Sequence, residues 1–306
     1  MSIGLLCPGQ GAQKVGMGVL WAERSPGARA IFDRANEALG YDLYALCAEG
    51  PADRLTRTDV CQPAILATSA ACLAAGEEEG RLDRSQLGAA LGLSLGEYTA
   101  LYAAGVLALE DALKLVHLRG TAMQEASNEP PSGMTSILGA TREEADEVCT
   151  AATAEGGVCV VANLNAPGQV VISGDKPALD RAEAIAAEKG FRRAIRLEVA
   201  GAFHSPLMEP ARARLEEAIA GCAFQTAQFP VYGNVDASPD TDPDALRGKL
   251  IRQLTSPVLF ADSIQRAMDD GVRSFVELSP GRVLTGLVKK VERKFPLTAA
   301  EGDWDQ

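Results

Sequence analysis

The sequence predicts an α/β protein with a mainly parallel sheet, into which a smaller ferredoxin-like unit is inserted. Short apolar runs alternate with helical patterns up to Ala126 and again from Pro206 onward, the order typical of a layered α/β domain. Between these stretches the patterns follow the order βαββαβ. With 306 residues, 47% of them apolar, the chain is long enough to bury a full core.

The two outer stretches carry the predicted parallel sheet. Ile3–Cys7 is an apolar run that ends in Pro8-Gly9-Gln10-Gly11, which is typical of a buried strand that opens into a tight turn. A second such run, residues 89–93, ends directly before Ser94. Further strands are expected at residues 230–232 and 274–278, and helices at 16–24, 27–39, 63–79, 97–104, 109–126, 207–220, 244–254, 261–270 and 283–294.

A boundary is expected at residues 128–133, where the alternation stops in a segment with two prolines and a glycine. The prediction is that residues 129–198 form the ferredoxin-like subdomain and residues 1–128 and 199–306 form the large one. Asn165-Ala166-Pro167-Gly168 supplies the central hairpin turn of the small subdomain. Its strands are expected at 134–138, 158–164, 169–173 and 193–199, and its helices at 142–154 and 177–189.

Charge and composition exclude several classes of function. A formal net charge of -12 argues against non-specific binding to nucleic acid, whose phosphates require a basic face. An apolar run long enough to span a membrane is missing, and the first residues lack the pattern of a signal peptide, so we expect a cytoplasmic protein. Two local basic clusters are more typical of solvated faces than of binding sites: Arg192, Arg193 and Arg196, and Lys289, Lys290, Arg293 and Lys294.

The cysteines indicate neither a disulfide framework nor a metal site. Their number is odd and none forms a C-x-x-C pair. We therefore expect no bound metal and interpret them as core or surface thiols. The seven are Cys7, Cys47, Cys61, Cys72, Cys149, Cys159 and Cys222.

Ser94 is the candidate nucleophile. Gly92-Leu93-Ser94-Leu95-Gly96 fits G-x-S-x-G, and it lies between a predicted strand and a predicted helix, where this motif forms a nucleophile elbow. An isolated match of this length is more often an ordinary glycine turn, but the flanking strand and helix favour function. The helix would place backbone N–H groups, that of Leu95 first, beside the hydroxyl.

A serine hydroxyl needs a base to take its proton, usually a histidine. The chain has only two. His117 lies inside a predicted helix, which favours a structural or surface role. His204 follows a predicted strand in Gly201-Ala202-Phe203-His204-Ser205-Pro206, at the same kind of sheet edge as Ser94. A solvated loop histidine is the alternative, yet a serine elbow without a base would be idle, so His204 is the candidate base.

The segment Gly9-Gln10-Gly11 leaves three interpretations open. It matches neither G-x-G-x-x-G nor the Walker pattern, so a phosphate loop is weakly supported. It could instead direct the backbone N–H of Gln10 at a reacting carbonyl, as a second oxyanion donor beside Leu95. A plain glycine turn is the third interpretation.

Together these residues resemble the malonyl-CoA:acyl carrier protein transacylases over nearly the whole chain. The resemblance implies an α/β-hydrolase-like large subdomain with a ferredoxin-like small one inserted, in agreement with the element order. It is carried by seven blocks in order: Pro8 to Gln13, Gly92 to Tyr98, Arg119-Gly120 with Met123-Gln124, Asn165 to Ile172, Gly201 to Ser205, Arg252-Gln253-Leu254 and Pro280-Gly281.

By this resemblance Ser94 is the nucleophile and His204 its base. The backbone N–H groups of Gln10 and Leu95 form the oxyanion hole, and Arg119 binds the malonyl carboxylate with its fork of donors. Without the resemblance, Arg119 would be interpreted as a surface helix residue. The other implied site residues are Gln253, which supports the histidine, and Asn163 and Asn165, which line the cleft, although turn chemistry explains Asn165 equally well.

The sequence departs from the family at one position: Leu93 stands where most members have a histidine. The departure leaves Ser94 and His204 intact but removes a polar group beside the nucleophile. The Gly201-Ala202-Phe203-His204 block resembles the form that selects malonyl over methylmalonyl, because Phe203 crowds the space of an α-methyl group.

The implied reaction is a ping-pong transfer of malonyl from malonyl-CoA through Ser94 to the phosphopantetheine thiol of an acyl carrier protein in fatty-acid biosynthesis. It needs no cofactor or metal, and we expect a monomer with no nucleic-acid or membrane partner. Three alternatives remain: the same chemistry in a polyketide pathway, a serine thioester hydrolase, and a non-catalytic acyl-binding scaffold. A hydrolase would usually place its histidine nearer the C-terminus than His204 lies.

Overall fold

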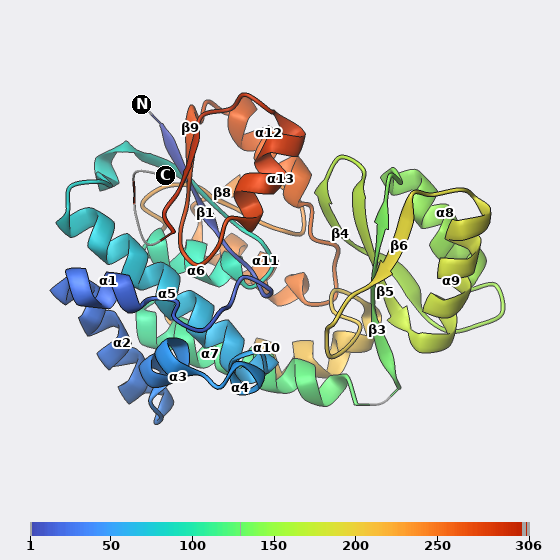
Figure 1. Cartoon of the computed structure of the whole chain (residues 1–306), viewed down its shortest axis with the longest axis horizontal. Coiled ribbons are helices and arrows are strands. Elements are labelled where there is room, and N and C mark those ends of the chain that lie inside the picture. Colours follow the sequence, from blue (N-terminus) through green and yellow to red (C-terminus); the bar gives the residue numbers. More distant parts are fainter. Residues whose placement is uncertain (1, 129, 302–303, 305–306) are drawn as a thin grey trace.

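The chain folds into two lobes, each built on its own sheet, as Figure 1 shows. The computed structural model describes residues 2–128, 130–301 and 304. The larger lobe contains both outer stretches of the chain, and the smaller one contains the middle stretch. Glu129, in the predicted boundary, lies outside the described residues. The predicted α/β architecture with an inserted unit is confirmed.

The large lobe has a central sheet in the order β10-β9-β1-β2-β7-β8. All neighbouring pairs are parallel except β7 and β8. Because β1 and β2 are adjacent and parallel, the loops that follow them meet at the same sheet edge. The strands are β1 (Ile3–Cys7), β2 (Leu87–Gly92), β7 (Val231–Tyr232), β8 (Pro239–Asp240), β9 (Ser274–Glu277) and β10 (Leu297–Ala299).

Helices cover both faces of this sheet (Figure 1). Those before the small lobe are α1 (Val19–Arg24), α2 (Pro26–Leu39), α3 (Leu43–Glu49), α4 (Ala52–Leu55), α5 (Thr58–Glu78), α6 (Gly96–Ala103) and α7 (Leu109–Ala126), with a 3₁₀ turn η1 (Arg84–Gln86) before β2. Those after it are the 3₁₀ turn η2 (Pro206–Met208), α10 (Glu209–Ala220), α11 (Pro243–Gln253), α12 (Phe260–Asp269) and α13 (Val283–Val291).

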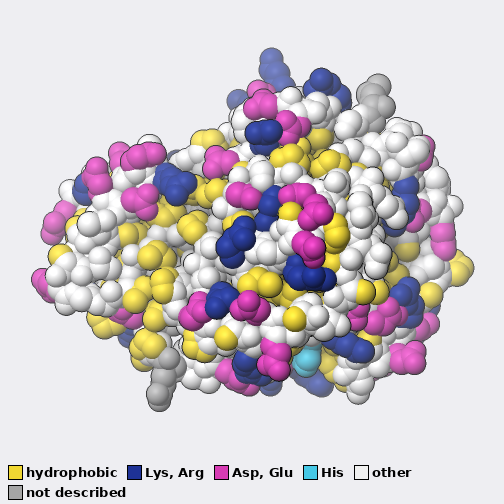
Figure 2. Space-filling model, turned by 180° about the vertical axis from the view of Figure 1, so that it is seen from behind, with side chains coloured by type: hydrophobic (Ala, Val, Ile, Leu, Met, Phe, Trp, Pro, Cys, Tyr) yellow, Lys and Arg dark blue, Asp and Glu magenta, His cyan; other side chains and the backbone are white. Residues whose placement is uncertain are grey.

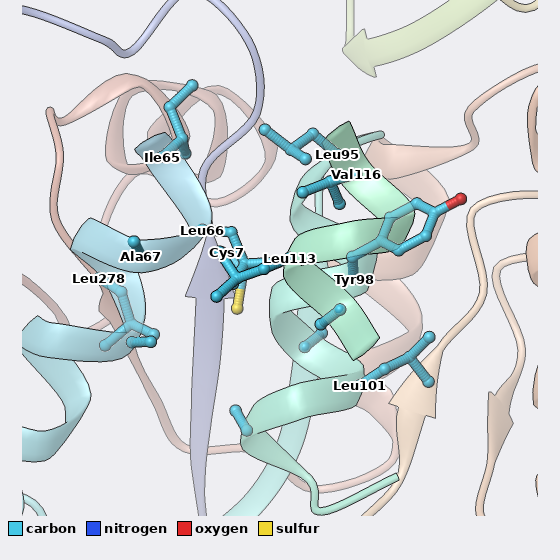
Figure 3. Packing of buried hydrophobic residues seen from close by; sticks show 14 of the residues in the cluster. Cys7, Ile65, Leu66, Ala67, Leu95, Tyr98, Leu101, Leu113, Val116 and Leu278 are labelled. Carbon is cyan, nitrogen blue, oxygen red and sulfur yellow. The ribbon is translucent and has the colours of Figure 1, made fainter. Parts of the chain in front are cut away.

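Helix α5 is the central core helix of the large lobe. By length and mean hydropathy, 1.2, it could span a membrane, but 89% of its apolar window is buried inside the protein. An all-round apolar helix is typical of a buried core position. Figure 3 shows how it packs beside β1, α6 and α7, with contributions from Cys7, Ile65, Leu66, Ala67, Leu95, Tyr98, Leu101, Leu113, Val116 and Leu278.

A buried proline interrupts the hydrogen bonds of α5 and gives His117 a structural task. Pro63 lies inside the helix and has no N–H to donate to the carbonyl of Asp59, four residues earlier. The ring Nδ1 of His117 lies 2.9 Å from that carbonyl oxygen. His117 is half-buried and joins α7 to α5, as expected for a structural histidine.

The small lobe is an antiparallel sheet in the order β4-β5-β3-β6, the ferredoxin-like arrangement predicted from βαββαβ. Alternate residues face opposite sides: Val170 and Ile172 pack under the two helices, whereas Val171 between them joins the core of the large lobe. The elements are β3 (Ser132–Leu138), α8 (Arg142–Ala152), β4 (Cys159–Ala166), β5 (Gln169–Asp175), α9 (Lys176–Glu188) and β6 (Arg193–Arg196).

Several predicted bounds are wrong. Helix α5 begins at Thr58, five residues before the predicted start, because Pro63 lies inside the helix and not at its first position. Helix α13 ends at Val291, three residues before the predicted end. Strand β3 begins at Ser132, inside the predicted linker. The predicted strand 193–199 ends at Arg196, because Leu197 and Val199 turn away to pack on the core of the large lobe. The predicted helix 16–24 begins only at Val19, since Gly16 and Gly18 have φ values of 90° and 80°.

Candidate active site

Ser94 occupies a sharp turn between β2 and α6. A Cβ on Gly92 would lie 2.0 Å from the carbonyl carbon of Gly96, and one on Gly96 would lie 2.0 Å from the carbonyl oxygen of Cys7. Both positions therefore require glycine, as the motif predicts. Ser94 itself has a left-handed φ of 52°, a strained conformation for a residue with a side chain that persists only where its surroundings fix it.

His204 lies within hydrogen-bond distance of Ser94: its Nε2 is 2.8 Å from Ser94 Oγ. Its Nδ1 is 2.9 Å from the backbone carbonyl oxygen of Gln253. Because a carbonyl only accepts, Nδ1 carries the proton and Nε2 presents its lone pair to the hydroxyl. Burial, and then the positive charge of Arg119, lower the pKa of His204 to about 4. The imidazole is therefore neutral at pH 7 and able to take a proton from the serine.

Arg119 is buried, not on a surface helix, with only 1% of its area exposed. One nitrogen, Nη2, donates to Ser94 Oγ at 2.9 Å and to Gln253 Oε1 at 3.1 Å, and Nη1 donates to Gln62 Oε1 at 2.9 Å. Burial lowers its pKa, but a guanidinium stays charged in proteins. Among the described residues Arg119 forms no direct ion pair with a carboxylate, although the buried Glu97 acts on its charge at longer range and the ring of Tyr98 lies 5.6 Å from the guanidinium carbon.

A cleft of about 640 Å³ opens above Ser94. The loops after β1 and β2 touch there, since a Cβ on Gly9 would lie 2.4 Å from the carbonyl oxygen of Leu93. The large lobe contributes Gly9, Gln10, Leu93, Ser94, Phe203 and His204 to its lining, and the small lobe contributes Met134, Asn163, Asn165 and Val171. Leu95 lies beneath, fully buried, at the start of α6.

The model of the acyl transferase domain matches residues 5–301. The malonyl CoA-acyl carrier protein transacylase of Bacillus subtilis (strain 168) is 44% identical over 297 residues, which cover 97% of this chain and 92% of the relative. The chain belongs to the malonyl-CoA:acyl carrier protein transacylase family. The Escherichia coli (strain K12) transacylase is 41% identical over 284 residues, covering 93% of this chain and 91% of the relative.

Solved structures of transacylases share the fold. An acyl carrier protein S-malonyltransferase from Vibrio cholerae superposes with a TM-score of 0.93 at 40% identity, covering 98% of this chain and 96% of that one. A malonyl-transacylase in complex with a type II polyketide acyl-carrier protein also has a TM-score of 0.93, at 38% identity, covering 99% of this chain and 96% of that one.

In this member of the transacylase family, Gln253 touches the histidine through its backbone and not through its side chain. Its carbonyl faces His204, while its side-chain Nε2 donates to the carbonyl oxygen of Ser94 at 2.8 Å. Support of the histidine thus comes from the end of α11, and the amide group serves the serine and the arginine instead.

Three polar residues of the site were not predicted. Asn234 accepts the backbone N–H of Ser94 at Oδ1, 2.8 Å away, and donates from Nδ2 to the carbonyl oxygen of Gly92 at 2.7 Å. Glu97 is buried beneath the elbow, and Gln62 binds Arg119. Asn234 lies 140 residues from Ser94 in sequence, so no local pattern links them. Glu97 lies in the block Gly92 to Tyr98 that carries the family resemblance, but its position in the sequence does not indicate which residues it contacts.

Leu93, the departure from the family pattern, is half-buried and lines the cleft beside Ser94. Its side chain packs on the apolar cluster that contains Val258 and Phe260. The floor of the cleft next to the nucleophile is therefore apolar here.

Proposed function

We propose that this chain transfers malonyl from malonyl-CoA to the phosphopantetheine thiol of an acyl carrier protein, through a malonyl ester of Ser94. The observation that carries the proposal is Arg119, a buried cation without a carboxylate partner among the described residues, 2.9 Å from Ser94 Oγ. Such a group favours an acyl chain that ends in a carboxylate. The names of its relatives pair malonyl-CoA with acyl carrier protein.

Proton transfer in both half-reactions is assigned to His204. Neutral Nε2 takes the proton of Ser94 as Oγ attacks the thioester carbonyl, and it returns that proton to the sulfur of coenzyme A as the C–S bond breaks. The carrier thiol then loses its proton to the same nitrogen and attacks the malonyl ester, which regenerates the Ser94 hydroxyl. The carbonyl of Gln253 keeps the imidazole in the required tautomer.

The backbone N–H groups of Gln10 and Leu95 are assigned as the donors that stabilise the negatively charged oxygen of the tetrahedral intermediate. Leu95 directly precedes the first residue of α6, where unpaired N–H groups and the helix dipole favour negative charge. Gln10 lines the same cleft from the loop after β1. Pre-oriented donors of this kind supply a large share of acyl-transfer catalysis.

Selection among acyl groups is assigned to Arg119 and Phe203. Arg119 would bind the malonyl carboxylate, and Phe203, 6% exposed and on the cleft lining, would restrict the space for an α-methyl group. Asn163, buried on the facing wall, offers an amide to the amide-rich pantetheine arm.

The proposed setting is fatty-acid biosynthesis in the cytoplasm. All seven cysteines are free thiols, which suits a reducing compartment. The proposed subdomain limits, 1–128 with 199–306 and 129–198, are supported by the two crossings between lobes, one between α7 and β3 and one after β6. A polyketide role is the second candidate, favoured by the structural match to a transacylase bound to a polyketide carrier.

Intact-mass measurement tests the proposal. The protein is incubated first with malonyl-CoA and then with the phosphopantetheine form of an acyl carrier protein. One malonyl group should appear on the wild-type chain and then on the carrier, while Ser94→Ala should remain unlabelled. Free malonate without carrier labelling would indicate a thioesterase, and no change in either mass would indicate a binding scaffold. Carriers from fatty-acid and polyketide systems, offered together, would separate the two pathways.

A further inference from the structure

We propose that Glu97 is a positioning residue, whose buried carboxylate aligns Ser94 and Arg119 by holding Gln253 and Asn234. This inference rests on the proposed transfer reaction. It concerns a residue that takes no part in the bond-making or proton-transfer steps of that reaction. Glu97 is the second residue of α6, directly after the serine motif, and only 1% of its area is exposed.

One carboxylate oxygen of Glu97 holds both groups that fix the backbone of the nucleophile. Its Oε2 accepts from Gln253 Nε2 at 2.8 Å and from the backbone N–H of Asn234 at 3.1 Å. Gln253 Nε2 also donates to the carbonyl oxygen of Ser94, and Asn234 Oδ1 accepts the N–H of Ser94, each at 2.8 Å. The two peptide groups flanking Ser94 are therefore tied to partners of a single carboxylate.

The same contact sets the direction of the Gln253 amide. Nε2 faces oxygens of Glu97, Ser94 and Asn234, at 2.8, 2.8 and 3.4 Å. Rotation of the amide by 180° would place Oε1 against these acceptors and would turn Nε2 towards the guanidinium of Arg119. Glu97, together with the carbonyl oxygen of Ser94 and Oδ1 of Asn234, therefore keeps Oε1 as the group that accepts from Arg119 Nη2.

This alignment matters because the nucleophile is held in a strained conformation. Ser94 has a φ of 52°, and strained backbone is retained only where surrounding contacts fix it. Its hydroxyl must stay 2.8 Å from His204 Nε2 and 2.9 Å from Arg119 Nη2 at once. A displacement on the order of 1 Å at such a site can lower a rate about 100-fold.

Burying this carboxylate is unfavourable, which indicates that it is kept for a purpose. Desolvation raises the pKa of Glu97 to about 7, despite the opposing effects of Gln253, Asn234 and Lys249. Lys249 is already paired with Asp236 and Asp240 at 3.3 and 3.6 Å. The direct partners of Glu97 are thus the two residues that contact Ser94.

The first test compares variants that remove or retain the acceptor. Glu97→Leu should lower kcat for malonyl transfer about 100-fold, and Glu97→Gln, which can keep an oxygen towards Gln253, should lose about 10-fold or less. Glu277→Leu is the matched control: Glu277 is also fully buried and accepts two backbone N–H groups, from Leu284 and Thr285. The control should lose thermal stability but keep kcat within about twofold per folded molecule. A folded Glu97→Leu with kcat near that of the wild type would overturn the proposal.

A double-mutant cycle distinguishes positioning from general stability. If Glu97 acts through Gln253, the variant with both Glu97→Leu and Gln253→Leu should be no slower than the slower single variant. If the fold loss in kcat of the double variant equals the product of the losses of the two single variants, the proposal is contradicted. If the leucine variant does not fold, the cycle is made with Glu97→Ala, which also removes the acceptor, and the same two outcomes decide.

A neutral serine reagent separates this inference from the function proposed above. Phenylmethylsulfonyl fluoride reports the reactivity of Ser94 without any acyl substrate. Glu97→Leu should slow its labelling of Ser94 about tenfold or more relative to wild type and Glu277→Leu. That result would stand even if the wild-type chain failed to transfer malonyl, and unchanged labelling would overturn the role of Glu97 alone.

Discussion

The two walls of the cleft differ in how their polar groups are held. On the large-lobe wall, Ser94 and His204, with Arg119 buried next to Ser94, each have at least two described hydrogen-bond partners. On the small-lobe wall, the buried Oδ1 of Asn165 has no hydrogen-bond partner among the described residues, and Met134 and Val171 add apolar side chains to the lining. A pre-organised wall suits bond-making steps, whereas free polar groups and apolar surface suit ligand binding. We therefore expect the bond-making steps on the large lobe and recognition of the pantetheine arm on the small one.

Figure 2, which shows the molecule from behind, adds an electrostatic view of recognition. Acidic and basic side chains alternate across this face, within a chain of net charge -12. We therefore expect little long-range attraction between this chain and any carrier of the same sign of charge, so that docking would depend on local contacts near the cleft.

The largest expected effect is on the large-lobe wall, at His204. His204→Ala should lower the rate of malonyl transfer by about 10² to 10⁴, because the serine loses its base. His117→Ala is the control, since His117 contacts the carbonyl of Asp59 and the ring of Tyr41 and lies outside the cleft lining. Its rate should stay within about twofold of wild type, while its stability falls by about 1 kcal/mol. Steady-state kinetics and thermal unfolding of both variants decide. The opposite ranking of rates would remove His204 from the site.

Arg119 gives the next largest effect. Arg119→Ala should lower kcat/KM for malonyl-CoA by at least about 2 kcal/mol, or about 30-fold, because the substrate carboxylate loses its charged partner. Acetyl-CoA carries no carboxylate, so its slow turnover should be unchanged or improved. The deciding quantity is the ratio of the two kcat/KM values in wild type and variant. An unchanged ratio would mean that Arg119 does not discriminate between the malonyl and acetyl groups.

The pH dependence of Ser94 reactivity tests how strongly the large-lobe wall excludes solvent. With a pKa of about 4 for His204, Ser94 should keep most of its reactivity towards a neutral serine reagent at about pH 5.5. An unshifted histidine with a pKa near 6.5 would leave only about one-tenth. The acid limb is measured from labelling rates between about pH 4 and 8 in the Glu97→Gln variant, because Glu97 itself has a pKa of about 7 and contacts the partners of Ser94. A limb near pH 6.5 in that variant would contradict the buried, neutral state of the imidazole.

The lowered pKa of His204 also makes the stability of the folded protein depend on pH. As pH falls below about 6.5, the unfolded chain takes up a proton on His204 before the folded protein does. The contribution of this group to stability is therefore fully present above about pH 6.5 and is lost as pH falls towards 4. His204→Ala should remove this part of the pH dependence of unfolding.

The smallest effect is expected on the small-lobe wall. Asn163→Ala should raise KM for malonyl-CoA about fivefold, the loss of one hydrogen bond of about 1 kcal/mol, with kcat within about twofold. Labelling of Ser94 by the serine reagent should not change. A large fall in kcat would mean that the small lobe also takes part in the bond-making steps.

The sequence predicted the fold well where the patterns were long and missed elements that were short. The order of the small lobe followed from its period-two strands and the turn at Asn165-Ala166-Pro167-Gly168. Helices α3 and α4 and strands β8 and β10 were not predicted. Of these, β8 has two residues and α4 has four, too few for a periodicity, and they form because neighbouring elements pair or pack with them.

In the site, the sequence revealed residues with local signals and missed those defined by distant contacts. Ser94 is marked by the glycines that its turn requires, and His204 by the scarcity of histidines. Arg119 has no local signal in its helix, so its role came from the family resemblance. Asn234 and Gln62 act across 140 and 57 residues of chain, and only the folded sheet brings them to the elbow and the arginine.

The strand order of the large sheet has a consequence for synthesis on the ribosome. Strand β1 is flanked by β2 and by β9, and β9 (Ser274–Glu277) is synthesised long after both. Until then one edge of β1 stays unpaired, and the apolar faces that β9 and α13 later cover remain exposed. The growing chain thus carries the serine elbow well before it carries Asn234 or Gln253, and its sheet closes only after β9 has been synthesised. Nascent chains in this state are exposed to aggregation and are natural clients for chaperones.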